Sequence, residues 1–212
     1  MSAGGSGVTN FSSQRGMMDF GDYINPERTW AHNNEDDSIL NGLREYFRLE
    51  APVRLRQALV GARHNSHIDF IAFDPDPLRR GTMPAHCPEH TDGATYPSHM
   101  WAYGLLAAYW VSGNPDFLET AISVGENMLR WQKDDPTIFY ADSRECGWPA
   151  QAFCALYEQT GDRKWLKGVR AVFEQLRRTV NKDGVILTAL PHGVGTSVSG
   201  YGEFASWRGL YF

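Results

Sequence analysis

The chain repeats a pattern of two helices joined by a tight turn, and this repeat limits its possible folds more than any other feature. In the two clearest copies, Tyr109 and Gly113 recur as Tyr157 and Gly161, with the spacing between tyrosine and glycine unchanged. Periods of roughly 20–50 residues are typical of helical solenoids and of closed rings of hairpins. Because one such unit cannot bury its apolar face alone, neighbouring copies must pack together. We therefore expect an all-α fold.

A weaker copy precedes these two, and the opening of a fourth follows them. The earlier copy begins near Ile39, and its Tyr46 is the counterpart of Tyr109. The fourth opens at Trp207, the counterpart of Trp148, and the sequence contains it as far as Phe212. These copies predict a solenoid or a closed ring of helical hairpins, and the interrupted fourth copy predicts that the chain is only part of that fold.

Composition divides the chain into two parts. Residues 1–16 are rich in Gly and Ser and are expected to be a flexible N-terminal segment. Residues 17–212 are expected to form the domain that contains the repeated hairpins. The chain is 42% hydrophobic and 21% charged, which is typical of a protein that forms a core and not of a disordered one.

Helix-start signals support this division into hairpins. Asn114 and Pro115 are a side-chain cap followed by a residue suited to the first helical position. Gly161 and Asp162 occupy the corresponding place in the next copy. The first copy keeps the proline but lacks the glycine and the cap, and its helices are expected over about 35–48 and 52–66.

Charge and apolar patterning exclude several classes of function. The net charge of −5 leaves no strongly basic surface, so neither nucleic acid nor an anionic membrane is expected as a partner. No apolar run reaches the roughly 18 residues that span a bilayer. The N-terminus has no apolar signal region, which predicts a cytoplasmic protein if that N-terminus is genuine. No phosphate loop or dinucleotide fingerprint is present, so no cofactor is expected.

The three cysteines are odd in number and form no CxxC pair, so neither a disulfide framework nor a cysteine zinc site is expected. Cys154 falls on a predicted apolar helix face and is expected to be a core residue.

The connections between hairpins are long, at about 67–98, 133–147 and 181–205. Loops of such length are uncommon unless they are functional. Each hairpin returns the chain to the end at which it started, so all three loops are expected on one face. That face is expected to carry the functional site.

The first of these loops is dense in histidine. His86, His90, Tyr96 and His99 lie in one short stretch that leads into a predicted helix. Histidine is suited to proton transfer near neutral pH, so these four residues are the candidate catalytic groups. A solvated polar loop and a metal site are the alternatives. The intervening Pro88 disfavours the helix that would align His86 with His90, and no metal is expected.

Two further groups are candidates for substrate binding. Asn33, Asn34 and Glu35 could bind sugar hydroxyls, or could serve only to cap a helix. Arg63 and His64 could bind a carboxylate, or could serve only as partners of a helix dipole.

Arg144 and Trp148 precede the third hairpin and complete the candidate binding set. Arg144 could instead form a structural ion pair with its neighbour Glu145. Trp148 is included because aromatic side chains in loops suit stacking on sugars.

The order of these motifs resembles the C-terminal α/α toroid of YetA-like exo-acting rhamnogalacturonan lyases, in the six-hairpin glycosidase-like superfamily. The resemblance covers roughly residues 17–180, and its most specific part is the stretch from His86 to Trp101. It is carried by DFGD at 19–22, WAHNNEDD at 30–37, ARHNSHIDF at 62–70, HCPEHTDGATYPSHMWAYGLL at 86–106 and RECGWP at 144–149.

The resemblance implies that residues 17–212 form an incomplete α/α toroid, with about three and a half of six hairpins. It also implies that the full ring is catalytic, follows a β-rich domain and cleaves a polysaccharide containing uronic acid by β-elimination. The expected partner is therefore a polysaccharide or oligosaccharide, together with the missing part of the toroid and the β-rich domain. Whether the fragment alone is an enzyme stays open.

β-Elimination at a uronate requires three functions, which the candidates can supply. The substrate carboxylate would be neutralised by Arg63, His64 or Asn34. The base would be His90 or His86, and the acid that protonates the leaving oxygen would be Tyr96 or His99. No cofactor is required.

Two other functions remain open. A glycoside hydrolase on the same toroid needs two carboxylates that flank the scissile bond. The available candidates are Asp22, Glu35, Asp36, Glu89 and Glu145. A helical-repeat scaffold or carbohydrate-binding remnant without activity is the other alternative, although the long and dissimilar loops disfavour a scaffold.

Overall fold

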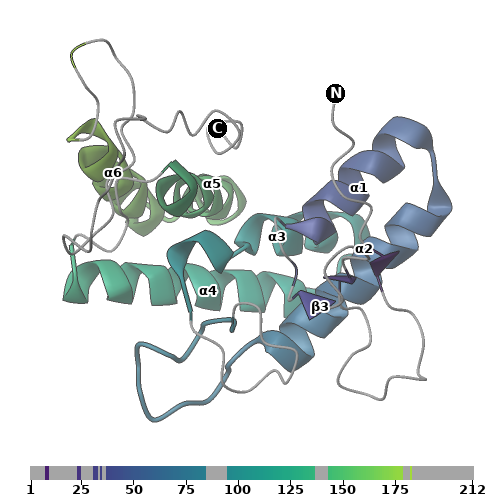
Figure 1. Cartoon of the computed structure of the whole chain (residues 1–212), viewed down its shortest axis with the longest axis horizontal. Helices are drawn as coiled ribbons and strands as arrows, with labels where there is room; N and C mark the ends of the chain where they lie inside the picture. Colours follow the sequence, from purple (N-terminus) through teal and green to yellow (C-terminus); the bar gives the residue numbers. More distant parts are fainter. Residues whose placement is uncertain are drawn as a thin grey trace, which may run out of the picture. The chain divides into compact units, whose positions relative to one another are not determined.

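The computed structural model describes residues 8–9, 23–24, 31–32, 34, 37–84, 95–136, 143–178 and 182, with backbone only at 8–9, 23–24, 31–32 and 143–145. Six α-helices dominate this part of the chain (Figure 1). They are α1 (Ser38–Leu49), α2 (Pro52–His64), α3 (Ala102–Ser112), α4 (Pro115–Asp134), α5 (Ser143–Thr160) and α6 (Lys164–Arg177). The predicted all-α class is confirmed.

Three shorter features accompany the helices. A π-helical turn, η2 (Asn65–Asp69), continues α2, and a 3-10 turn, η3 (Pro97–His99), precedes α3. Strands β1 (Val8–Thr9), β2 (Tyr23–Ile24) and β3 (Ala31–His32) form a small antiparallel sheet in that order. The sequence predicted no strand in this region.

The first three predicted repeats are pairs of helices joined by a short turn, and the predicted fourth copy, from Trp207, lies outside the described residues. α1 pairs with α2 and α5 pairs with α6, and only a short turn separates the helices within each hairpin. Of the described residues, none belongs to a helix that is both long enough and apolar enough to cross a membrane.

The turns of the second and third hairpins share one hydrogen-bond pattern. Gly113 and Gly161 have φ angles of 72° and 68°, a left-handed conformation that glycine adopts readily. Their N–H groups donate to the carbonyls of Tyr109 and Tyr157 at 2.7 and 2.8 Å. The repeat read from the sequence is therefore reproduced by the backbone.

Side chains repeat in these turns as well. The Ser112 hydroxyl donates to the Ala108 carbonyl at 2.6 Å and accepts from the Asn114 N–H at 3.2 Å. One repeat later, the Thr160 hydroxyl donates to the Leu156 carbonyl at 2.7 Å and accepts from the Asp162 N–H at 3.2 Å. Asn114 and Asp162 then accept from N–H groups at the starts of α4 and α6, at 3.2 and 2.9 Å. These are the predicted caps.

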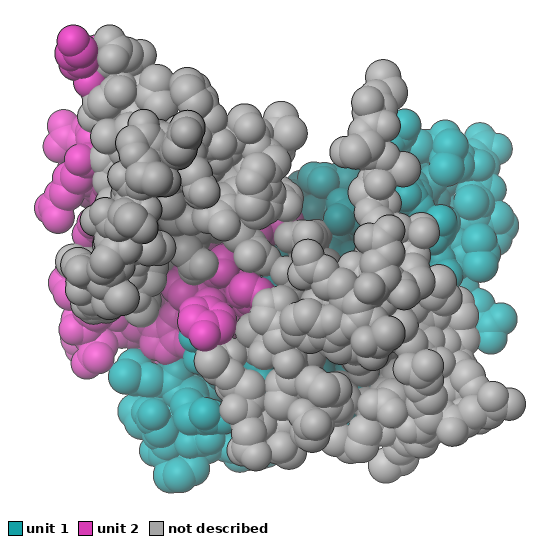
Figure 2. Space-filling model, in the orientation of Figure 1, with its two compact units in different colours: residues 1–95, 101–124 teal, residues 96–100, 125–212 magenta. Residues whose placement is uncertain are grey.

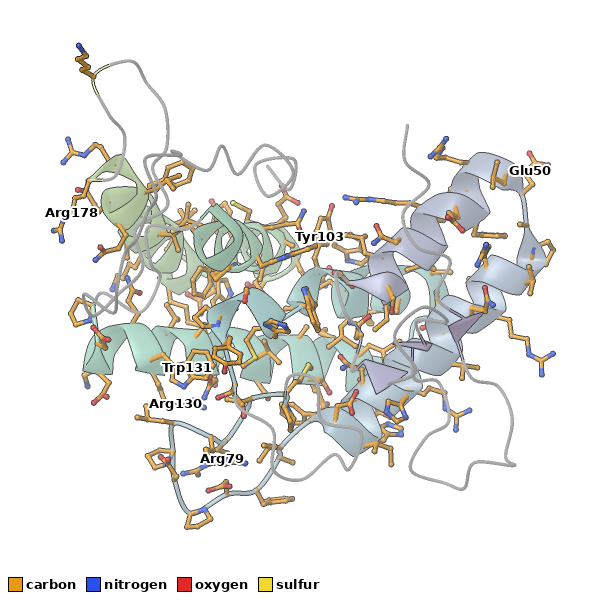
Figure 3. All side chains as sticks on the ribbon, viewed as in Figure 1. Glu50, Arg79, Tyr103, Arg130, Trp131 and Arg178 are labelled. Carbon is orange, nitrogen blue, oxygen red and sulfur yellow. The ribbon has the colours of Figure 1, made fainter. Side chains whose placement is uncertain are left out.

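The first hairpin keeps this turn geometry with a different residue. Glu50 stands in the same position relative to Tyr46 as Gly113 does relative to Tyr109. It ends α1 in the left-handed region, with φ 48° and ψ 39° (Figure 3). A side chain in this conformation costs about 1–2 kcal/mol. The first helix of the weaker copy therefore ends in the same left-handed conformation, in a turn that its side chain strains.

The buried faces of α4 and α6 are also in register. Every residue of α6 that is buried has a buried counterpart in α4, at the same offset that relates Gly161 to Gly113. The pairs are Phe117 and Trp165, Thr120 and Gly168, Val124 and Val172, and Met128 and Leu176. A common set of inward positions explains why the two segments share a sequence pattern.

The chain divides into two compact units, which Figure 2 colours separately. Unit 1 consists of residues 1–95 and 101–124, and unit 2 of residues 96–100 and 125–212. In unit 1, α3 packs against α1 and α2. In unit 2, α5 packs against α6 and η3.

The core of unit 2 shows how closely its helices approach. The rings of Phe153 and Trp165 stack with their centroids 6.3 Å apart. A Cβ atom at Gly168 would lie 2.7 Å from the Phe153 ring, so only glycine allows α6 to approach α5 this closely.

Two local predictions were wrong. Cys154 is exposed whereas Cys146 is buried, because the inward face of α5 is formed by the residues on either side of Cys154. The first helix begins at Ser38 and not near residue 35, because Asp37 takes a left-handed conformation and caps the helix.

Candidate functional site

Two described polar groups precede α1 in unit 1. Asn34 and Asp37 both have positive φ angles, 52° and 53°, which Asn and Asp tolerate better than most residues. Asn34 Oδ1 accepts hydrogen bonds from the Ser38 hydroxyl at 2.8 Å and from the Ile39 N–H at 3.1 Å. The buried Asn34 therefore orders the start of α1, which was one of its two predicted roles. Asn33 and Glu35 lie outside the described residues.

Asp37 is a buried carboxylate that caps two helices. Its Oδ1 accepts from the Leu40 N–H in the first turn of α1 at 3.2 Å. Its Oδ2 accepts from the Gly104 N–H in the first turn of α3 at 2.8 Å, although the two residues are far apart in sequence. The Trp101 cap position of α3 supplies no side-chain cap of its own. Both helix dipoles therefore act on one carboxylate.

Gly104 is required for this contact. A Cβ atom at this position would lie 1.9 Å from Asp37 Oδ1. No real contact is that short, so any side chain at residue 104 would displace the carboxylate. The close approach of α3 to the start of α1 thus depends on a residue without a side chain.

The burial of Asp37 changes its acidity. Burial raises the pKa of Asp37 to about 7, although the hydrogen bonds from Leu40 and Gly104 and the charge of Arg44 lower it. The Asn34 side chain also lowers this pKa, but its amide nitrogen makes no hydrogen bond of good geometry. Both carboxylate oxygens are occupied by helix caps, so Asp37 has a structural role.

The end of α2 carries a second buried polar group in unit 1. Asp69 is fully buried, with Oδ1 3.3 Å from His64 Nε2, and its Oδ2 accepts from Asn65 Nδ2 at 3.1 Å. The backbone of η2 explains this arrangement, because the Phe70 N–H donates to the Asn65 carbonyl, one position further back than in a regular α-helix. A π-turn of this kind brings residues five apart onto one side, and such turns are frequent at functional sites.

The predicted pair Arg63 and His64 divides into an exposed and a buried residue. Arg63 is exposed at the surface, whereas His64 is only 2% exposed. Of the two, Arg63 is therefore the one available to a carboxylate in solution. In η2, Nε2 of the exposed His67 lies 3.1 Å from Oδ2 of Asp116 in the first turn of α4.

Unit 2 places two predicted catalytic residues together. The rings of Tyr96 and His99 are 5.7 Å apart between centroids. Ser98 lies beside them, with its Oγ 3.0 Å from His99 Nδ1. Tyr96 is 46% exposed, but His99 is buried. Only Tyr96 of this pair presents its side chain to solvent.

Of the remaining predicted site residues, one is buried and the others lie outside the described part of the chain. Trp148 is 4% exposed and packs in the core of unit 2 at α5, which makes it unsuited to stacking on a sugar. His86 and His90, the candidate bases, lie outside the described residues, as does the side chain of Arg144.

The carboxylates of the hydrolase alternative are also outside the described part of the chain. They are Asp22, Glu35, Asp36, Glu89 and the side chain of Glu145. Among the described residues, no group of three metal-ligating side chains could hold an ion.

Three residues were missed by the sequence reasoning. Asp37 was noted only as part of an acidic run, and Asp69 and Ser98 were given no role. The HNSHID motif contained one usable signal, because Asn65 and Asp69 are four apart and can meet on one side of a helix. No local pattern indicates the contact between Asp37 and Gly104.

Comparison of the chain with protein-family models, with curated proteins and with solved structures yields no match.

Proposed function

We propose that this chain is a carbohydrate-active domain of the α/α-toroid type that cleaves uronic-acid-containing pectic polysaccharide, of the rhamnogalacturonan kind, by β-elimination. The support comes from the order of the sequence motifs and from the repeated helical hairpins. A toroid of six hairpins, of which this chain would be a part, is included in the proposal.

The observation that carries the proposal is the arrangement of Tyr96, Ser98 and His99. A phenol can donate its proton to a leaving oxygen only if that oxygen can reach it. Tyr96 satisfies this condition, because almost half of its side chain is exposed. His99 lies against it and is held by Ser98, which fixes the orientation of the imidazole ring. We assign proton donation to Tyr96 and a positioning role to His99.

The remaining roles follow the chemistry of a uronate. The carboxylate must be neutralised before the C5 proton becomes acidic, and this role is assigned to Arg63 on the sequence alone. The base that removes this proton is assigned to His90 or His86 on the sequence alone. The electron pair of the broken C5–H bond forms the C4–C5 double bond as the C4–O bond breaks.

A lyase assay with matched variants tests the proposal. The chain is incubated with pectin-derived oligomers, and absorbance of the unsaturated product is followed together with reducing sugar. Tyr96→Phe is expected to lower the rate by roughly 100-fold or more. The control Tyr157→Phe, which changes a tyrosine of the same unit that is 36% exposed, is expected to keep the rate.

Two results would contradict the proposal. Reducing sugar without a rise in absorbance would indicate hydrolysis by paired carboxylates. No product of either kind would favour a protein without catalytic activity. Replacement of His90 separates elimination from hydrolysis, since hydrolysis should survive its loss better.

A further inference from the structure

The loop that follows η2 holds a phenylalanine almost entirely in water. Phe73 is 94% exposed, the largest value among the exposed apolar side chains of the described residues. A single exposed apolar side chain is common on proteins. The structure of the loop around Phe73 makes this one unusual.

The loop is closed by its own backbone. The Ile71 N–H donates to the Thr82 carbonyl at 2.9 Å, and the Gly81 N–H donates to the Ile71 carbonyl at 2.8 Å. Phe73 lies two residues after Ile71, whose backbone makes both of these hydrogen bonds. In Figure 3 the loop, marked by Arg79, extends beyond the end of α2.

Side chains within the loop brace it further. Asp74 Oδ1 accepts from the Asp76 N–H, and Asp76 Oδ1 accepts from the Leu78 N–H, both at 2.8 Å. Arg79 Nε lies 3.3 Å from Asp74 Oδ2. These contacts, with two prolines in the same stretch, fix the backbone on both sides of Phe73 before any ligand arrives.

The size of the exposed surface limits what can bind it. Stable protein interfaces bury about 800 Å² on each partner, which a single ring cannot supply. The neighbouring exposed residues are mostly small, charged or proline, and they form no continuous apolar patch. One flat ring on a rigid loop matches the apolar face of a pyranose, whose C–H groups are attracted to the partly negative face of an aromatic ring.

We propose that Phe73 is an aromatic stacking platform for one sugar ring of an oligosaccharide. This inference rests on the proposed carbohydrate function and adds a subsite to it. Arg79 pairs with Asp74, and we assign the attraction at this subsite to the ring. Its contribution is therefore expected to be insensitive to salt, unlike that of exposed charges.

Calorimetric titration of the whole chain with pectin-derived oligomers tests the subsite. Phe73→Ala is expected to weaken binding by roughly tenfold, and Phe73→Trp to restore it. The control is Phe47→Ala, which removes another exposed phenylalanine of unit 1, on α1, and is expected to leave binding unchanged. The same ratio between wild type and Phe73→Ala is expected at low and high salt.

The outcomes separate the subsite from the function. Equal binding by wild type and Phe73→Ala would overturn the subsite and leave the carbohydrate function intact. Equal losses of oligomer affinity in Phe73→Ala and Phe47→Ala would also overturn the subsite. A wild-type chain that neither binds nor cleaves the oligomers would overturn the proposed function and the subsite with it. Far-ultraviolet circular dichroism confirms that each variant is folded.

Discussion

The starts of α4 and α6 differ from those of α1 and α3 in how their N–H groups are satisfied. α4 and α6 are capped locally, by Asn114 and Asp162 in exposed turns close in sequence to the groups they bind. α1 and α3 share one buried carboxylate, which is distant in sequence from α3. Local caps stabilise each hairpin separately, whereas a shared cap makes the packing of α3 depend on the start of α1. The same chemical requirement thus has a local and a tertiary solution.

The largest expected effect comes from the pH dependence of the shared cap. Because burial raises the pKa of Asp37 from 3.8 to about 7, the folded state keeps a proton that the unfolded state has lost between these values. The free energy of unfolding should therefore fall as the pH rises from about 4 to about 7. For a difference of about three pKa units, this loss is roughly 4 kcal/mol.

Urea unfolding at several pH values checks this prediction against Asp37→Asn. Because the asparagine has no titrating proton, the free energy of unfolding of this variant should change less between about pH 4 and 7 than that of the wild type. Its stability at low pH should be lower by about 1 kcal/mol, because the amide cannot accept both N–H groups. Parallel profiles for the two proteins would show that Asp37 does not titrate in this range.

The next largest effect is expected from a change at Gly104, which donates the hydrogen bond to Asp37. Gly104→Ala places a methyl group where the Asp37 carboxylate lies and separates it from the Gly104 N–H. We expect a loss of about 3 kcal/mol in the free energy of unfolding, from overpacking and from a buried N–H group without its partner. Gly42→Ala is the matched control, since its nearest neighbour outside its own helix would lie at 3.2 Å. A similar loss in both variants would mean that the contact with Asp37 has no special importance.

The smallest effects concern the repeated turns. Gly113→Ala and Gly161→Ala should each cost about 1 kcal/mol in the free energy of unfolding. The left-handed backbone is strained for alanine, although no atom beyond the two adjacent residues lies within 4 Å of the added carbon. Glu50→Gly should instead stabilise the first hairpin by about 0.5–1 kcal/mol. Denaturant midpoints compare the three variants. A destabilised Glu50→Gly variant would show that the first turn is not equivalent to the other two.

The sequence was sufficient to predict the hairpins and their turns. The tyrosine and glycine spacing located the second and third turns, and Tyr46 with the following Pro52 located the first, because turn geometry depends on residues close in sequence. The short sheet and the exposure of Cys154 were not predicted. Neither follows from helical periodicity, which indicates where a face is and not which neighbour covers it.

The candidate site was predictable in part. The sequence selected Tyr96 and His99, which the structure places together, and Arg63 and His64, which the structure separates by burial. It did not select Asp69, whose contact with His64 depends on the π-turn. The spacing of residues 64 and 69 would not bring them onto one side of a regular α-helix.

The sequence by itself determined the all-α class, the repeat length and the local caps, because each depends on contacts between residues close in the chain. Only the tertiary structure decided which polar groups are buried and which reach solvent. Asp37 is the clearest case, since its second helix cap requires Gly104, from a distant part of the chain, to approach without a side chain. Burial depends on the packing of whole helices, and a local pattern of residues does not contain that information.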